Sequence, residues 1–189
     1  MSLWAGAPRP SPPNDLRPPA PSLIWGLVTS LLLLLTMLTI LPARGDADIH
    51  ARWTLAQAIA AATADVDEQN LLVAVALRES NFAPAAKGDF HGGKATSFCA
   101  FQLHLPGRSR TAEGWSGEDV AADVTKCTQA ALRLIRQSQT ACSFLPKEER
   151  LAVYASGRCD SEAGRRLSRD RMALAKRVAT EARKHAGTP

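Results

Sequence analysis

The sequence predicts an all-α domain, and three observations support this fold class. Residues 71–77, Leu-Leu-Val-Ala-Val-Ala-Leu, are apolar on every side of a helix, which is typical of a buried central helix. Residues 117–139 place their apolar side chains on one helical face. No run of alternating apolar and polar residues is long enough to indicate a convincing strand.

The N-terminal part of the chain, which has 189 residues in all, differs in composition from the rest. Residues 1–22 are rich in proline, so we expect a solvated arm without fixed structure. Residues 23–41 carry no charge and just reach the length that spans a bilayer. We therefore interpret residues 23–47 as an export segment, either a signal peptide cleaved at Gly45-Asp46-Ala47 or an uncleaved anchor in the membrane.

Residues 48–189 then form one domain of about 140 residues, which is large enough to bury its own core. Its first helix is expected at 54–64, where Leu55 and Ile59 have helical spacing. The second is expected at 68–80, with Asp65 or Asp67 as its N-cap and Pro84 preventing its continuation.

Glycines and prolines interrupt residues 85–117, which predicts a long structured loop with a short hairpin or helix at 98–103. Loops of this length are usually functional. Three more helices are expected at 117–139, at 147–156 with Gly157 ending it, and at 162–184.

Four cysteines, an even count, follow the export segment and predict two disulfides. If helices 117–139 and 147–156 form an antiparallel hairpin that turns near Ser143, Cys127 and Cys159 come level with each other. This leaves Cys99 to pair with Cys142. A metal site is the competing use, but neither Cys-x-x-Cys nor His-x-x-x-His spacing accompanies Cys99 and His104, so we expect no metal and no cofactor.

The formal net charge of +5 and the pI near 9.3 favour an anionic polymer as partner, such as those of the bacterial envelope. Nucleic acid is a poor alternative, because the domain is expected to be exported to the periplasm or cell envelope. The chain also has a single tyrosine and does not interleave aromatic with basic residues. The sequence does not determine the oligomeric state.

Glu79 is the main candidate for catalysis. It stands alone near the end of the expected helix 68–80, directly after the apolar run and shortly before Phe101 and Gln102. A carboxyl at the negative end of a helix, beside apolar neighbours, tends to keep its proton near neutral pH. The general acid of a glycosidase needs this property.

Three segments resemble the soluble, goose-lysozyme-like lytic transglycosylases. Residues 79–86, Glu-Ser-Asn-Phe-Ala-Pro-Ala-Ala, match the family pattern Glu-Ser-x-Phe-x-Pro-x-Ala. Residues 100–106, Ala-Phe-Gln-Leu-His-Leu-Pro, align with Gly-Leu-Met-Gln-Leu-x-Pro when one residue is skipped, and residues 152–157, Ala-Val-Tyr-Ala-Ser-Gly, align with Ala-x-Tyr-Asn-Ala-Gly. The chain departs from the family at a lost glycine, at Phe101 in place of methionine, and at Ala155 in place of asparagine.

This resemblance implies a lysozyme-like helical domain that cleaves the β-1,4 bond between MurNAc and GlcNAc in peptidoglycan. Glu79 would be the single general acid and base, giving 1,6-anhydro products. Ser80, Phe101 and Gln102 would contact the glycan, and Tyr154 would hold the carboxyl of Glu79.

Two alternatives remain open. A peptidoglycan-binding or scaffold module of an envelope machine could keep the fold without catalysis, and the lost asparagine and glycine would suit it. A hydrolytic lysozyme would use a second carboxylate about 5 to 9 Å from Glu79, for which Asp89 is the best candidate.

Overall fold

The computed structural model describes residues 23–187, so the expected Pro-rich arm lies outside the described residues. The described part contains seven α-helices, one 3-10 turn and three strands of two residues each. It is therefore mainly helical, as the sequence predicts.

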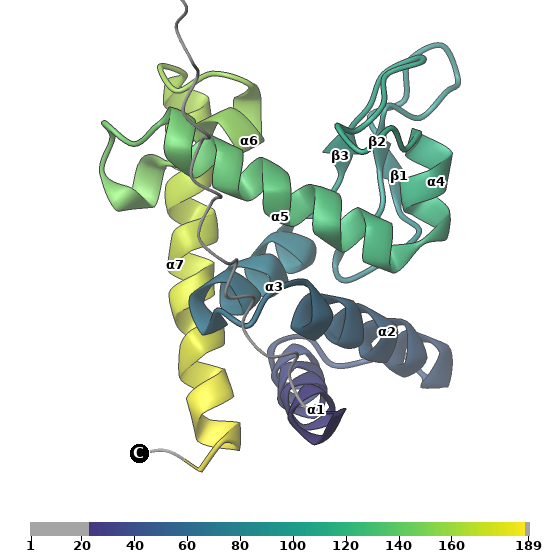
Figure 1. Cartoon of the computed structure of the whole chain (residues 1–189), viewed down its shortest axis with the longest axis vertical. Helices are drawn as coiled ribbons and strands as arrows, with labels where there is room; N and C mark the ends of the chain where they lie inside the picture. Colours follow the sequence, from purple (N-terminus) through teal and green to yellow (C-terminus); the bar gives the residue numbers. More distant parts are fainter. Residues whose placement is uncertain (1–22, 188–189) are drawn as a thin grey trace, which may run out of the picture.

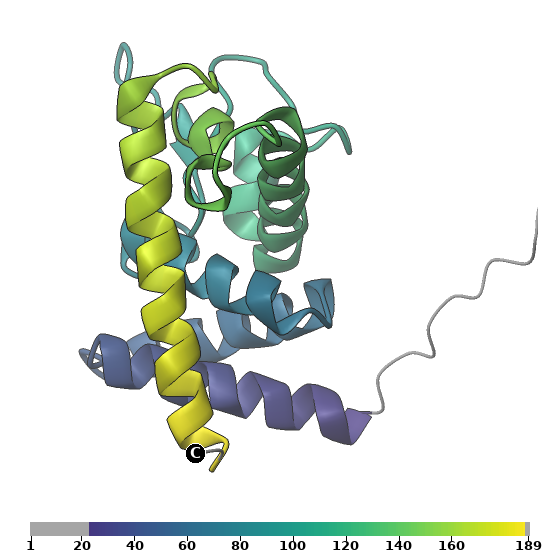
Figure 2. The ribbon, with the colours of Figure 1, turned by 90° about the vertical axis from the view of Figure 1, so that its left-hand side faces the viewer.

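The first two helices pack together at one end of the molecule. Helix α1 (Leu23–Ile40) contacts both α2 (Asp46–Ala62) and the C-terminal helix α7 (Glu162–His185), and Figure 1 shows α1 below α2. In Figure 2, α7 runs along the front of the molecule and crosses α1 near its lower end. Among residues 23–187, no helix is both long and apolar enough to cross a membrane.

Helix α3 (Val66–Ser80) is the buried central helix that the sequence predicts. The side chains from Leu71 to Ala76 are all buried, and α3 packs mainly against α7. Asp65 caps the N-terminus by accepting hydrogen bonds from the backbone N–H groups of Asp67 and Glu68. The helix ends at Ser80 because Asn81 adopts the left-handed conformation with φ 54°.

The long loop contains a small antiparallel sheet of β1 (Lys87–Gly88), β2 (Ser97–Phe98) and β3 (Leu103–His104), in that order. Lys87 pairs with Phe98, and Ser97 pairs with His104. Strands of two residues are too short to show alternation, which is why the sequence predicts only a hairpin or helix here. Figure 1 shows the sheet beside α4, away from α7.

The helix expected at 117–139 is two helices, α4 (Gly117–Ala122) and α5 (Val124–Ala141). They are separated by Asp123, whose backbone is extended and whose side chain accepts hydrogen bonds from the N–H groups of Thr125 and Lys126. The break therefore begins a new helix with its own cap.

The helix expected at 147–156 is also shorter than predicted. A 3-10 turn (Lys147–Glu149) precedes α6 (Ala152–Ser156), and Gly157 ends α6 with φ 76°. Helix α6 packs against both α7 and α5.

The structure contains two disulfides, but the predicted pairing is wrong. Cys99 bonds to Cys127 and Cys142 to Cys159, rather than Cys99 to Cys142 and Cys127 to Cys159. The prediction assumed a long helical hairpin. Because residues 143–158 instead fold into a compact loop, Cys159 returns to the C-terminal end of α5, where Cys142 lies. Cys127, in the first turns of α5, meets the turn after β2.

Candidate active site

Residues from α3, the sheet, α6 and α7 line one cavity of about 500 Å³. Five of the six side chains to which the sequence analysis assigns site roles line it, namely Glu79, Asp89, Phe101, Gln102 and Tyr154. Ser80 does not. Its hydroxyl donates to the backbone oxygen of Ala100 at 2.9 Å and thereby ties the end of α3 to the turn between β2 and β3.

Glu79 projects from the last turn of α3, and its side chain is 18% exposed. Its Oε1 accepts two hydrogen bonds from Arg171, one from Nε at 2.9 Å and one from Nη2. Its Oε2 accepts no hydrogen bond from residues 23–187 and is not a buried unpartnered atom, so it remains in contact with solvent. One carboxylate oxygen is thus held by the protein and the other is free.

Arg171 is the site residue that the sequence analysis missed. It lies on α7, is only 6% exposed, and is separated from Glu79 by 92 residues of chain. A buried charge is costly unless it is paired, and the carboxyl of Glu79 is the partner of this guanidinium. The expectation that the Glu79 carboxyl lies beside apolar neighbours does not hold, because its hydrogen-bond donor is a charged guanidinium.

A signal for Arg171 does exist in the sequence. The buried residues of α7 follow helical spacing and include a charged residue in the middle of the stripe: Gly164, Ser168, Arg171, Ala175 and Val178. An arginine in the middle of a buried stripe requires an acidic partner, although local sequence does not identify which one.

Tyr154 does not hold the Glu79 carboxyl, contrary to the role that the resemblance implies. Its hydroxyl donates a hydrogen bond to the backbone oxygen of Phe101 at 2.7 Å. Its ring centroid lies 6.0 Å from the guanidinium carbon of Arg171, within cation–π range. Burial raises the pKa of the Tyr154 hydroxyl far above its usual value, and the Glu79 carboxylate adds to this, so the hydroxyl stays a neutral donor.

Gln102 lines the cavity and also stabilises the turn between β2 and β3. Its Nε2 donates to the backbone oxygen of Cys99 at 3.0 Å. A Cβ atom added at Gly88 would lie 2.3 Å from Gln102 Oε1, so any other residue there would displace this amide. The amide therefore has a structural role whether or not it also contacts a sugar.

Asp89 belongs to a second polar group in the same cavity. It adopts φ 48°, and its carboxylate accepts a hydrogen bond of 2.5 Å from the Ser97 hydroxyl. Ser97 Oγ lies 3.5 Å from His104 Nδ1. Cys99, which the sequence analysis weighed as a metal ligand together with His104, is in a disulfide and has no free thiol.

The carboxylates of Glu79 and Asp89 are the acidic groups in this cavity, and they have different surroundings. Among residues 23–187, each has one oxygen that accepts hydrogen bonds and one that does not; the donor is the buried guanidinium of Arg171 for Glu79 and the Ser97 hydroxyl for Asp89.

No family model matches the chain, and searches of curated proteins and solved structures also found no match.

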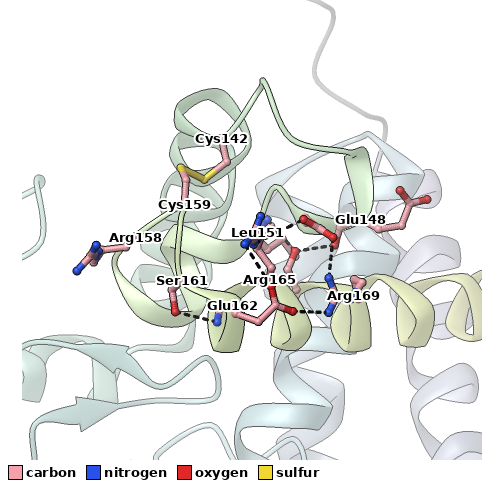
Figure 3. Close-up of polar contacts among 12 residues, drawn as sticks. Cys142, Glu148, Leu151, Arg158, Cys159, Ser161, Glu162, Arg165 and Arg169 are labelled. Atoms are coloured by element: carbon pink, nitrogen blue, oxygen red, sulfur yellow. Dashed lines mark hydrogen bonds and ion pairs between the residues drawn. A yellow bond between two sulfur atoms is a disulfide. The ribbon is translucent and has the colours of Figure 1, made fainter.

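A disulfide joins the wall that carries Tyr154 to the end of α5, and several polar contacts fasten it to α7, as Figure 3 shows. Cys142–Cys159 closes the loop from which α6 arises. The Ser168 hydroxyl donates to the backbone oxygen of Glu148 at 2.7 Å and accepts from the N–H of Leu151 at 2.9 Å. These contacts keep α6 against α7, and therefore keep Tyr154 beside Arg171.

Asp89 and His104 also line a second cavity, of about 1010 Å³, which adjoins the first at these two residues. The exposed ring of Phe90 is part of its lining. The two cavities together are large enough for a ligand that extends beyond Glu79 on the side of the sheet.

Proposed function

We propose that this protein is a peptidoglycan-cleaving glycosidase of the lytic transglycosylase type, with Glu79 as its single general acid and base. The observation that carries the proposal is that the three segments resembling this family meet in one place. The end of α3, the turn between β2 and β3, and α6 each contribute lining residues to the cavity around Glu79. These segments are far apart in the chain, so their meeting is not a result of local sequence.

The free oxygen of Glu79 suits both steps of the proposed reaction. In the first step, Oε2 gives its proton to the glycosidic oxygen, and the bond from this oxygen to C1 of the sugar breaks. In the second, Oε2 takes the proton of the sugar's own 6-hydroxyl while its oxygen bonds to C1. The product is a 1,6-anhydro sugar, and no water is consumed.

Arg171 leaves Oε2 available for both steps, because both of its hydrogen bonds go to Oε1.

The proposal includes a lysozyme-like fold for residues 48–189 and their export to the periplasm or cell envelope, with residues 23–47 as the export segment. The net charge of +5 supports peptidoglycan strands and associated anionic polymers as partners.

A catalytically silent peptidoglycan-binding module is the second candidate. The ion pair between Glu79 and the buried Arg171 favours it, because such a pair also occurs where a carboxylate is purely structural. Hydrolysis by Glu79 with Asp89 is a third candidate, supported by the fact that both carboxylates line the same cavity.

The experiment is digestion of purified peptidoglycan by the full chain and by Glu79→Gln, with mass spectrometry of the products. We expect 1,6-anhydro muropeptides from the wild type and a rate lower by about a hundredfold to ten-thousandfold from Glu79→Gln. Because the variant leaves Arg171 without its counter-charge, we also expect it to lose about 3 kcal/mol of stability, so circular dichroism must establish that it is folded at the assay temperature.

Two controls separate the three candidates. Glu162→Gln changes a glutamate outside the cavity and should retain activity. Asp89→Asn should retain most activity if Glu79 acts alone. Reducing-end products together with an inactive Asp89→Asn would identify a hydrolase, and a wild type that binds peptidoglycan without cutting it would identify a silent module.

A further inference from the structure

We propose that Arg171 is the positioning residue for Glu79, fixing Oε1 so that Oε2 alone exchanges the proton. This inference rests on the proposed function, and it assigns a role to a residue outside the three segments that resemble the family. It concerns Arg171 as a group that acts through Glu79, without touching the glycan itself.

The geometry of the pair supports positioning. Both Nε and Nη2 of Arg171 donate to the same oxygen, Oε1, instead of one to each carboxylate oxygen. A side-by-side pair would occupy both oxygens of Glu79 and leave neither for chemistry. The observed arrangement restricts rotation of the carboxyl and leaves Oε2 free.

Arg171 is itself held rigidly enough to orient another side chain. It is buried on α7, whose most extensive contact is with α3, and its guanidinium lies over the ring of Tyr154. Its Nη1 is buried without a hydrogen-bond partner among residues 23–187. Glu79 is thus the acceptor of all the side-chain hydrogen bonds that Arg171 makes in this part of the chain.

The other charged or titratable groups near Glu79 do not compete for this contact. Asp89 and His104 face the cavity from the sheet, where Asp89 is bonded to Ser97. Arg78, the neighbour of Glu79 on α3, is exposed, and Tyr154 on α6 is bonded to Phe101. Arg171 is accordingly the group that decides how the carboxyl is oriented.

The base step depends most on this orientation. If Oε2 is misplaced relative to the 6-hydroxyl, water can be deprotonated by Glu79 in its place. The oxygen of water then bonds to C1, its proton goes to the carboxylate, and the product has a reducing end. Loss of positioning should therefore change the type of product as well as the rate.

The test compares Arg171→Met and Arg171→Lys with wild type in the full chain, using purified peptidoglycan. We expect Arg171→Met to lower kcat by about a hundredfold with KM within about threefold, because orientation is lost while the glycan contacts remain. The share of reducing-end products should rise. Arg171→Lys keeps the charge but not the fork of donors, so it should recover part of kcat.

Arg177→Met is the matched control, because Arg177 is an exposed arginine on the same helix. It should leave kcat, KM and the product ratio unchanged.

A measurement independent of activity is the melting temperature of Glu79→Gln, Arg171→Met and the double variant. We expect the double variant to melt higher than Glu79→Gln alone, because it no longer buries an unpaired guanidinium.

The outcomes are distinguishable. A wild-type chain that cuts no glycan would overturn the proposed function and the positioning role together, although the melting temperatures would still report the ion pair. An active wild type whose Arg171→Lys variant keeps full kcat and an unchanged product ratio would overturn the positioning role alone. The Arg171→Lys result tests the positioning role even if Arg171→Met fails to fold.

Discussion

At the scale of single residues, Tyr154 joins the site through two different parts of its side chain. The hydroxyl reaches the Phe101 backbone at 2.7 Å, while the ring lies beside the Arg171 guanidinium. Phenylalanine at this position would keep the ring and lose the hydrogen bond. We predict that Tyr154→Phe lowers the free energy of unfolding by about 1 to 3 kcal/mol, because the buried carbonyl of Phe101 loses its donor. Chemical denaturation measures this loss.

The same variant should reduce glycan cleavage by less than about tenfold, because the hydroxyl bonds to the Phe101 backbone, does not contact Glu79, and leaves the ring beside Arg171 when it is removed. Tyr154→Leu also removes the ring from Arg171 and should reduce activity further. Equal activity of the two variants would contradict a role for the ring.

The Tyr154 hydroxyl should also make stability depend on pH. Because burial raises the pKa of the hydroxyl above its usual 10.0, wild-type stability should fall as the pH rises above this value, and Tyr154→Phe should remove this contribution.

At the scale of elements, α3 is held to its neighbours by an ion pair at each end. At the C-terminal end, Glu79 bonds to Arg171 of α7. At the N-terminal end, the two carboxylate oxygens of Glu68 each accept a hydrogen bond of 2.7 Å from Arg136 of α5. The hydrogen bond from Arg136 is the main reason why the pKa of Glu68 lies below its usual 4.5. A lowered pKa stabilises the fold above that pH, and the contribution is lost as the pH falls through the folded-state pKa.

We therefore predict that Glu68→Gln lowers the free energy of unfolding at pH 7 by up to about 1 kcal/mol, because Arg136 is partly exposed and the pair is screened. The difference from wild type should shrink as the pH is lowered from 7 to about 3, because the wild-type carboxyl then takes up protons. Urea denaturation at the two pH values checks this. Glu118→Gln, which removes an exposed pair with Lys87, is the control and should have little effect at either pH. A constant difference at both pH values would show that the charge of Glu68 is not what stabilises α3.

At the scale of the whole molecule, the two disulfides connect the cavity walls to the two ends of α5. Cys99–Cys127 fixes the turn that contains Gln102 to the start of α5, and Cys142–Cys159 closes the loop that contains α6. We predict that replacing Cys142 and Cys159 together by serine costs about 3 kcal/mol, the value for a loop of this size. Activity should fall before the fold is lost, because α6 carries Tyr154.

Peptide mapping without reduction tests the pairing directly. We expect peptides that join Cys99 to Cys127 and Cys142 to Cys159. A peptide that joins Cys99 to Cys142 would restore the pairing inferred from a helical hairpin and would contradict the compact loop at 143–158.

The sequence by itself determined the features that depend on neighbouring residues. Helix α3 could be predicted from its apolar run, its cap at Asp65 and the proline at 84, because capping and helix interruption act over a few residues. The mainly helical fold and the presence of two disulfides followed from periodicity and from the cysteine count. The break at Asp123 was missed because the apolar spacing continues through it and hides the new cap.

Only the tertiary structure decided which distant residues meet. The disulfide pairing depends on how residues 143–158 fold back, and the partner of Glu79 lies 92 residues later on another helix. The cavity likewise brings α3, the sheet and α6 together. Local patterns show that a buried arginine needs a carboxylate and that a cysteine needs a partner. They do not show which carboxylate or which cysteine is the partner, because the partner is set by how the helices pack across the core.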